Sequence, residues 1–149
     1  MGCGQDQMTL RHNLTLWMTA LCAVPTVAQA VGVDPVEGVW TTHNHKAVVQ
    51  IYGCGSAKCG SIIRPGNSPI PWPVTDTKNS DPALRSRSLV GLQIISNLSP
   101  ESDHWKGVIY SPEDGRSYAA TFSRLNNGTL KVKGCWMFLC RTQIWTPTK

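Results

Sequence analysis

The chain has 149 residues, of which 41% are hydrophobic and 15% charged. This length and composition suit one domain with a modest hydrophobic core. The formal net charge is +5 at pH 7, but the basic residues are scattered and form no run, so the charge does not indicate a nucleic-acid partner.

The first thirty residues have the pattern of a secretory signal peptide. Arg11 precedes a mostly apolar run from Leu14 to Val27, and Ala30 ends a small-x-small cleavage site. The segment from Met8 onward is already a complete signal peptide, so Met8 is an alternative start. The apolar run is too short to span about 30 Å of hydrocarbon. We therefore predict cleavage, export to the periplasm and no transmembrane anchor afterwards.

The mature chain, residues 31–149, is predicted to be a single domain with two disulfides, because an even set of four cysteines in an exported protein meets an oxidising compartment. Three pairings are open to sequence reasoning. We favour Cys54 with Cys59 and Cys135 with Cys140, since each pair brackets four residues that can turn a strand end back on itself. Zinc is the alternative, but the spacing is wide for a zinc knuckle and no histidine is near either pair.

Short β-prone segments separated by turn signals fill most of the mature chain. Pro112 and Gly115, for example, suit the turn of a hairpin. The predicted strands are residues 38–42, 46–52, 59–63, 89–98, 105–110, 116–124, 130–133 and 141–146. Eight short strands with tight turns predict an all-β fold, a small closed antiparallel barrel, because closure removes exposed sheet edges. A β-sandwich is the alternative.

One long connection, from Arg64 to about Ser88, interrupts this pattern. Its prolines exclude a central strand, while Asp81 followed by Pro82 predicts an N-cap and a single helical turn. Long loops in compact domains are commonly functional, so we expect the site here. The candidate ligand-binding residues are Trp72, Asp76, Asn79, Arg85 and Arg87.

Two interpretations of these polar loop residues remain open. Arginines beside Trp72 can bind a carboxylate or phosphate in bidentate fashion. Alternatively, Asp76 and Asn79 hydrogen-bond the loop backbone while Arg85 or Arg87 pairs with an acidic neighbour and pins the loop in place.

Trp136-Met137-Phe138-Leu139 places four apolar residues between two cysteines. We expect this segment to plug the barrel. The alternative is an exposed tip for a partner or a membrane surface.

Motifs for catalysis are lacking. We find no nucleophile elbow, phosphate-binding glycine loop or zinc-protease helix, so we predict neither an enzyme nor a cofactor. His43 and His45 could hold a metal with His104, but exposed turn histidines are the simpler interpretation, and we predict no metal site.

Several features together carry a family resemblance. They are Cys59-Gly60-Ser61-Ile62, the run from Lys78 to Arg87 leading to Gly91, the run from Trp105 to Tyr110 with Pro112-Glu113-Asp114-Gly115 and Tyr118, and finally Gly134 and Trp145. With them the mature chain resembles the exported bacterial family called domain of unknown function 2147. The resemblance implies a small barrel-like envelope protein without an assigned activity.

Gly38-Val39-Trp40 is similar to the G-x-W motif that begins lipocalin barrels. In those barrels the tryptophan packs across the closed end beneath a late basic residue, so the resemblance implies a lipocalin-like (calycin-like) barrel. It also implies structural roles for Gly38 and Trp40, with Arg141 stacking on Trp40. Trp145, as a large aromatic residue, is expected to pack structurally in the core or at a barrel end.

These observations predict a periplasmic barrel that binds a small amphipathic or anionic envelope ligand, with the long loop as a lid. The alternative is a non-enzymatic scaffold or interaction module whose barrel is filled by its own side chains and which docks on an envelope protein.

Overall fold

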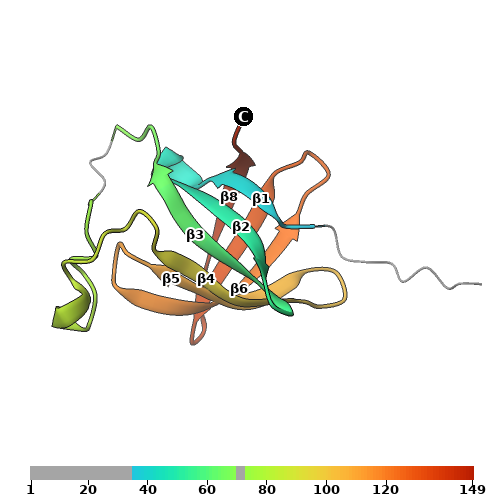
Figure 1. Cartoon of the computed structure of the whole chain (residues 1–149). Coiled ribbons are helices and arrows are strands. Elements are labelled where there is room, and N and C mark those ends of the chain that lie inside the picture. Colours follow the sequence, from blue (N-terminus) through green and yellow to red (C-terminus); the bar gives the residue numbers. More distant parts are fainter. Residues whose placement is uncertain (1–34, 70–72) are drawn as a thin grey trace, which may run out of the picture. The chain divides into compact units, whose positions relative to one another are not determined.

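Eight antiparallel strands form a closed barrel in the computed structural model, which describes residues 35–69 and 73–149 (Figure 1). Each strand pairs with the next, and β8 pairs with β1. The strands are β1 (Gly38–Thr41), β2 (Ala47–Cys54), β3 (Ala57–Pro65), β4 (Gln93–Pro100), β5 (Trp105–Ser111), β6 (Arg116–Arg124), β7 (Leu130–Trp136) and β8 (Leu139–Pro147). The predicted all-β barrel is confirmed.

Helix is almost absent from the described residues. The only helical elements among the described residues are two 3-10 turns, η1 (His43–His45) and η2 (Pro82–Leu84). Neither of these helices is long and apolar enough to cross a membrane. The predicted signal peptide and the candidate residue Trp72 lie outside the described residues.

The four cysteines pair as predicted, Cys54 with Cys59 and Cys135 with Cys140, with S–S distances of 2.02 Å and 2.08 Å. Cys135 and Cys140 lie directly opposite each other on β7 and β8. Both hairpins are longer than the sequence predicted, because the bracketed residues continue the strands and leave only a short turn at each tip.

The fourth strand begins later than predicted, at Gln93 instead of Leu89. Leu89 is fully buried but belongs to a turn, in which Leu92 N donates to Leu89 O at 3.1 Å. Gly91 has a φ of +88°, which breaks the extended backbone. Of the apolar residues at the start of the predicted strand, Leu89 is buried but Val90 is exposed, and none of them belongs to a strand.

The core fills the barrel interior with side chains from all eight strands. On β2, Val49 and Ile51 lie in the core while Gln50 and Tyr52 are exposed, although Val48 is buried as well. Phe122 and Trp145 meet edge to face, their ring centroids 6.3 Å apart. The buried cluster comprises Val36, Trp40, Ala47, Val49, Ile51, Ile62, Leu89, Ile94, Ile95, Leu98, Ala120, Phe122, Leu130, Val132 and Trp145, with Trp105, Ile109 and Tyr110 of β5 packed against it.

Trp40 is buried near the start of the barrel, where its indole Nε1 donates to Val36 O at 2.9 Å. The guanidinium over its ring belongs to Arg124 at the end of β6, 5.4 Å from the ring centroid. The expectation that Arg141 stacks on Trp40 is therefore wrong. Arg141 pairs with Gly134 six residues before β8 ends, whereas β1 pairs only with the last residues of β8.

The β7–β8 turn does not plug the barrel. Trp136, Met137, Phe138 and Leu139 are all exposed. The two strands continue to Trp136 and Leu139, so the turn extends away from an interior that other side chains already fill.

Candidate functional site

A buried carboxylate anchors the long loop to the barrel. Asp76 is 0% exposed. Its Oδ1 accepts from the Tyr110 hydroxyl of β5 at 2.6 Å, and its Oδ2 accepts from Asn79 Nδ2 at 2.8 Å. Arg87 adds Nε and Nη2 to the same Oδ2, at 2.9 Å and 2.8 Å. Three residues, one from β5 and two from the loop, thus donate to one carboxylate. We call Asp76, Asn79, Arg87 and Tyr110 the loop anchor.

The rest of the loop is built outward from Asn79. Its side-chain Oδ1 accepts from Asp81 N at 2.9 Å, and its carbonyl accepts from Arg85 Nε at 2.8 Å. Asp81 in turn caps η2 by accepting from Ala83 N at 2.9 Å, as predicted. These bonds fix the loop between the anchor and the helical turn.

The loop anchor has the protonation states that its hydrogen bonds require. Burial alone would raise the pKa of Asp76, but hydrogen bonds from Tyr110, Asn79 and Arg87 outweigh it and hold that pKa below its usual value. Burial, together with the bond to Asp76, raises the pKa of Tyr110. At neutral pH the carboxylate is therefore ionised and the phenol is a neutral donor.

The loop also rests on the turn of the β5–β6 hairpin. Gly115 has a φ of +70°, and a Cβ placed there would lie 1.9 Å from Lys78 O and 3.2 Å from Asn79 Cα. Only glycine allows both this backbone conformation and this approach. The turn that the sequence placed between two strands thus also supports the loop.

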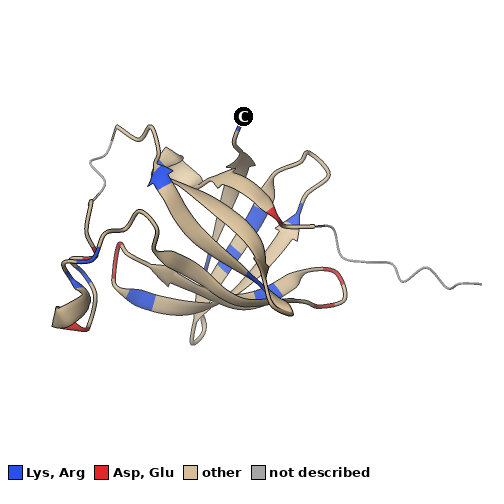
Figure 2. Ribbon diagram, in the orientation of Figure 1, with Lys and Arg blue, Asp and Glu red and all other residues tan. Residues whose placement is uncertain are grey.

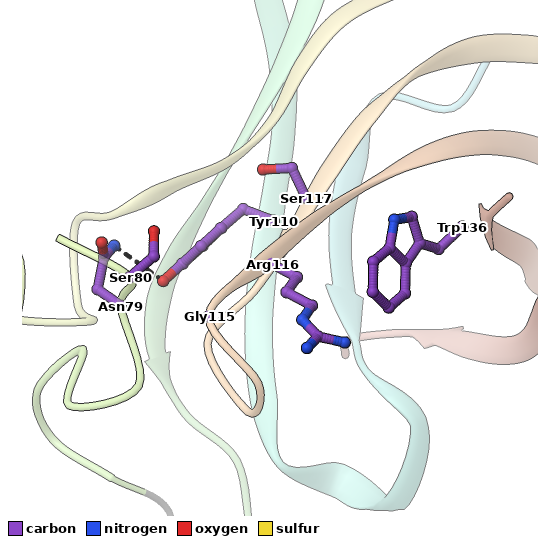
Figure 3. A pocket seen from close by; sticks show the side chains of 7 residues that line it. All are labelled: Asn79, Ser80, Tyr110, Gly115, Arg116, Ser117 and Trp136. Carbon is purple, nitrogen blue, oxygen red and sulfur yellow. Dashed lines mark hydrogen bonds between the residues drawn. The ribbon is translucent and has the colours of Figure 1, made fainter.

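A pocket of about 370 Å³ opens where the loop meets the barrel end. Asn79 and Ser80 form its loop side, and Trp136 of β7 lies across from them with Arg116 between (Figure 3). The lining residues are Asn79, Ser80, Tyr110, Gly115, Arg116, Ser117 and Trp136. They include no carboxylate.

Arg116 is the charged group of this pocket. Its guanidinium carbon lies 4.3 Å from the centroid of the Trp136 ring, a distance typical of a cation–π contact. Within the described residues no carboxylate forms an ion pair with Arg116. The nearby Asp114 instead accepts from Tyr118, and that hydrogen bond raises the pKa of Tyr118.

The structure brings four of the five predicted ligand residues together, but mostly to bond one another. Asp76 and Asn79 are buried within the loop anchor, Arg87 pairs with Asp76, and Arg85 donates to loop backbone. This arrangement matches the interpretation in which the loop is pinned in place. Of the four, only Asn79 lines the pocket.

Sequence reasoning missed most of the pocket lining. Arg116 and Trp136 are twenty residues apart and meet only through the pairing of β6 with β7. Tyr110 packs its ring against the core, while its hydroxyl is a central donor of the loop anchor. One sequence feature could have indicated the pocket. The turn of the 105–118 hairpin is polar, and a barrel places such a turn at one of its open ends.

His43, His45 and His104 do not assemble a metal site in the part of the chain that the structure describes. In the described part of the chain no three histidine, cysteine or acidic side chains converge in a way that could hold a metal ion. His104 instead pairs with Asp103, Nδ1 to Oδ1, at 2.7 Å.

The fold and the pocket place this protein in the class of small closed antiparallel barrels. Side chains fill its interior, and a polar pocket lies at one end. Residues 38–147 match the family described as an uncharacterized protein conserved in bacteria (DUF2147), and the chain belongs to that family. Among solved structures it is similar to protein HP1028 from the human pathogen Helicobacter pylori, which is described as belonging to the lipocalin family. The identity is 21% and the TM-score 0.65, over 77% of this chain and 84% of that one. No curated protein matches the chain. The likeness to HP1028 shows the fold, and the lipocalin-like barrel is thereby confirmed.

Proposed function

We propose that this protein is a periplasmic binding protein that holds a small amphipathic anion in the pocket at the barrel end. The observation that carries the proposal is Arg116, a guanidinium that lines the pocket, stacks on Trp136 and forms no ion pair within the described residues. Asp114 lies nearby but bonds the Tyr118 hydroxyl and the Arg116 backbone, so the guanidinium can still pair with an anionic partner.

The remaining lining suits such a ligand. The hydroxyls of Ser80 and Ser117 make no hydrogen bond within the described part of the chain and can donate to the same anion. The indole of Trp136, which lines the pocket, offers apolar surface for a short hydrocarbon group. The pocket thus combines an anion site with an adjacent apolar wall.

Export is part of the proposal. The bacterial family and the two disulfides agree with an oxidising compartment outside the cytoplasm. A binding role needs no catalytic group.

Arg116→Gln should weaken binding of octyl phosphate, a monomeric amphipathic anion, by at least about tenfold, because charge-assisted hydrogen bonds to the ligand are lost. Isothermal titration calorimetry measures the affinity. Lys133→Gln is the matched control, because it removes the same charge from an exposed position on β7 that does not line the pocket. Equal affinities for both variants and the wild type would refute the site.

A non-enzymatic interaction module is the second candidate function. Two observations favour it: core side chains fill the barrel interior, and four apolar side chains are exposed at the β7–β8 turn.

A further inference from the structure

The tip of the β7–β8 hairpin is an exposed apolar protrusion. Trp136, Met137, Phe138 and Leu139 are 47%, 81%, 84% and 67% exposed. In Figure 1 this hairpin, drawn in orange-red, reaches past the neighbouring strands. Soluble proteins rarely expose large apolar side chains in a contiguous group without using them in an interaction. We call residues 136–139 the apolar tip.

The local backbone holds the apolar tip in a defined shape. The Cys135–Cys140 disulfide closes the hairpin directly behind it, and strand pairing continues to Trp136 and Leu139. Met137 has a φ of +53°, at a turn position where glycine is usual. A methionine in this conformation costs stability compared with glycine, so the turn carries an apolar side chain where folding alone would favour none.

Two basic side chains lie beside the apolar tip, with the Asp114 carboxylate also close to Arg116. Arg141 follows the disulfide on β8, and Arg116 stacks on the Trp136 ring. From residue 116 to the end, the chain contains no aspartate or glutamate, and β6, β7 and β8 carry no acidic colour in Figure 2. The basic residues of this segment are Arg116, Arg124, Lys131, Lys133, Arg141 and Lys149.

We propose that the apolar tip docks this protein onto an anionic lipid surface. The tip is convex, so it suits insertion among lipid headgroups, and its backbone is hydrogen-bonded across the hairpin up to its last pair, as entry into an apolar phase requires. Tryptophan favours the membrane interface. Each basic side chain near an anionic leaflet strengthens binding by roughly fivefold, so Arg116 and Arg141 complement the lipid charge while the tip supplies apolar contact.

The test is cosedimentation with phosphatidylcholine vesicles that contain about 30% phosphatidylglycerol. All variants keep the same N-terminus as the wild type, so residues 1–34 contribute equally. Wild type should bind, and Met137→Ser combined with Phe138→Ser should weaken binding at least about tenfold. Ile144→Thr is the control, because it removes a 40% exposed apolar side chain six residues, or about 20 Å, along β8 from Phe138.

Four further measurements make the test specific. Vesicles of pure phosphatidylcholine should bind more weakly, as should Arg141→Gln on anionic vesicles. Bromine-labelled acyl chains should quench fluorescence of the wild type more than of Trp136→Phe. Thermal unfolding of the double variant checks that its fold is retained, which is expected because both side chains are mostly exposed.

Several results would overturn the proposal. One is vesicle binding that the double variant retains, and another is equal binding to charged and neutral vesicles. A dimer in analytical ultracentrifugation that the double variant dissociates would show that a second copy covers the tip. If the double variant loses vesicle binding but keeps its affinity for octyl phosphate, the tip binds lipid independently of the pocket.

Discussion

Replacing Asp76 by alanine should lower the free energy of unfolding by about 3 kcal/mol, because Tyr110, Asn79 and Arg87 lose their shared acceptor. We take the low end of the range for a broken buried pair, since the Arg87 side chain keeps 34% exposure and can regain water. Denaturant unfolding followed by circular dichroism measures the loss. The pocket should also lose its shape, because Asn79 and Tyr110 line it and would no longer be held by Asp76.

Asp81→Ala is the control for this prediction. It also removes one loop carboxylate, but from an exposed N-cap that accepts from Ala83 N. Its cost should be about 1 kcal/mol or less. Should the two variants lose equal stability, the loop anchor would contribute no more than an ordinary cap.

The contribution of Asp76 should also depend on pH. Despite burial, hydrogen bonds lower its pKa in the folded protein, whereas an unfolded chain has an aspartate pKa of about 3.9. A group with a lowered folded pKa stabilises fully above its unfolded pKa and loses that effect as pH falls through the folded value. The difference in unfolding free energy between wild type and Asp76→Ala should stay constant from pH 7 to about 4 and narrow below that. A difference that grew toward acid would contradict the lowered pKa.

Local patterns predicted the strands and both disulfides because each signal lies within a few residues. Cys135 and Cys140, for instance, pair across one hairpin, so chain proximity alone favours the bond. The Asp81 cap of η2 is equally local. Such features depend little on how the barrel closes.

The pocket depends on how the strands are staggered when the barrel closes, and local sequence patterns do not reveal that stagger. Asp76 and Tyr110 are separated by 34 residues, and which of many polar side chains meet is set by the stagger of the strands. The same stagger places Arg124 over Trp40, a contact that the lipocalin resemblance had assigned to Arg141. Pattern reasoning can name candidate arginines, but it cannot choose between them without the register.

The apolar tip shows a different limit. Four apolar residues in a row predicted burial, yet the structure exposes them. Burial rules describe core residues well and surface residues poorly, because much of any protein surface is apolar.

Gly115→Ala should destabilise the protein by about 3 kcal/mol and detach the long loop. About 1 kcal/mol comes from forcing an alanine to a positive φ. The rest comes from the added Cβ, which would lie 1.9 Å from Lys78 O and must push the loop backbone away. Hydrogen exchange measured by mass spectrometry should show faster exchange over residues 74–89, and octyl phosphate should bind more weakly.

Gly55→Ala is the control that separates the cost of a positive φ from the cost of the added Cβ. Gly55 has a φ of +71°, matching the +70° of Gly115, but a Cβ at Gly55 meets nothing within 4 Å. This control should lose only about 1 kcal/mol, with exchange over the loop unchanged. Equal losses in the two variants would mean that the loop does not rest on the β5–β6 turn. A larger loss at Gly115 that coincides with weaker octyl phosphate binding would show that the docked loop forms one wall of the binding site.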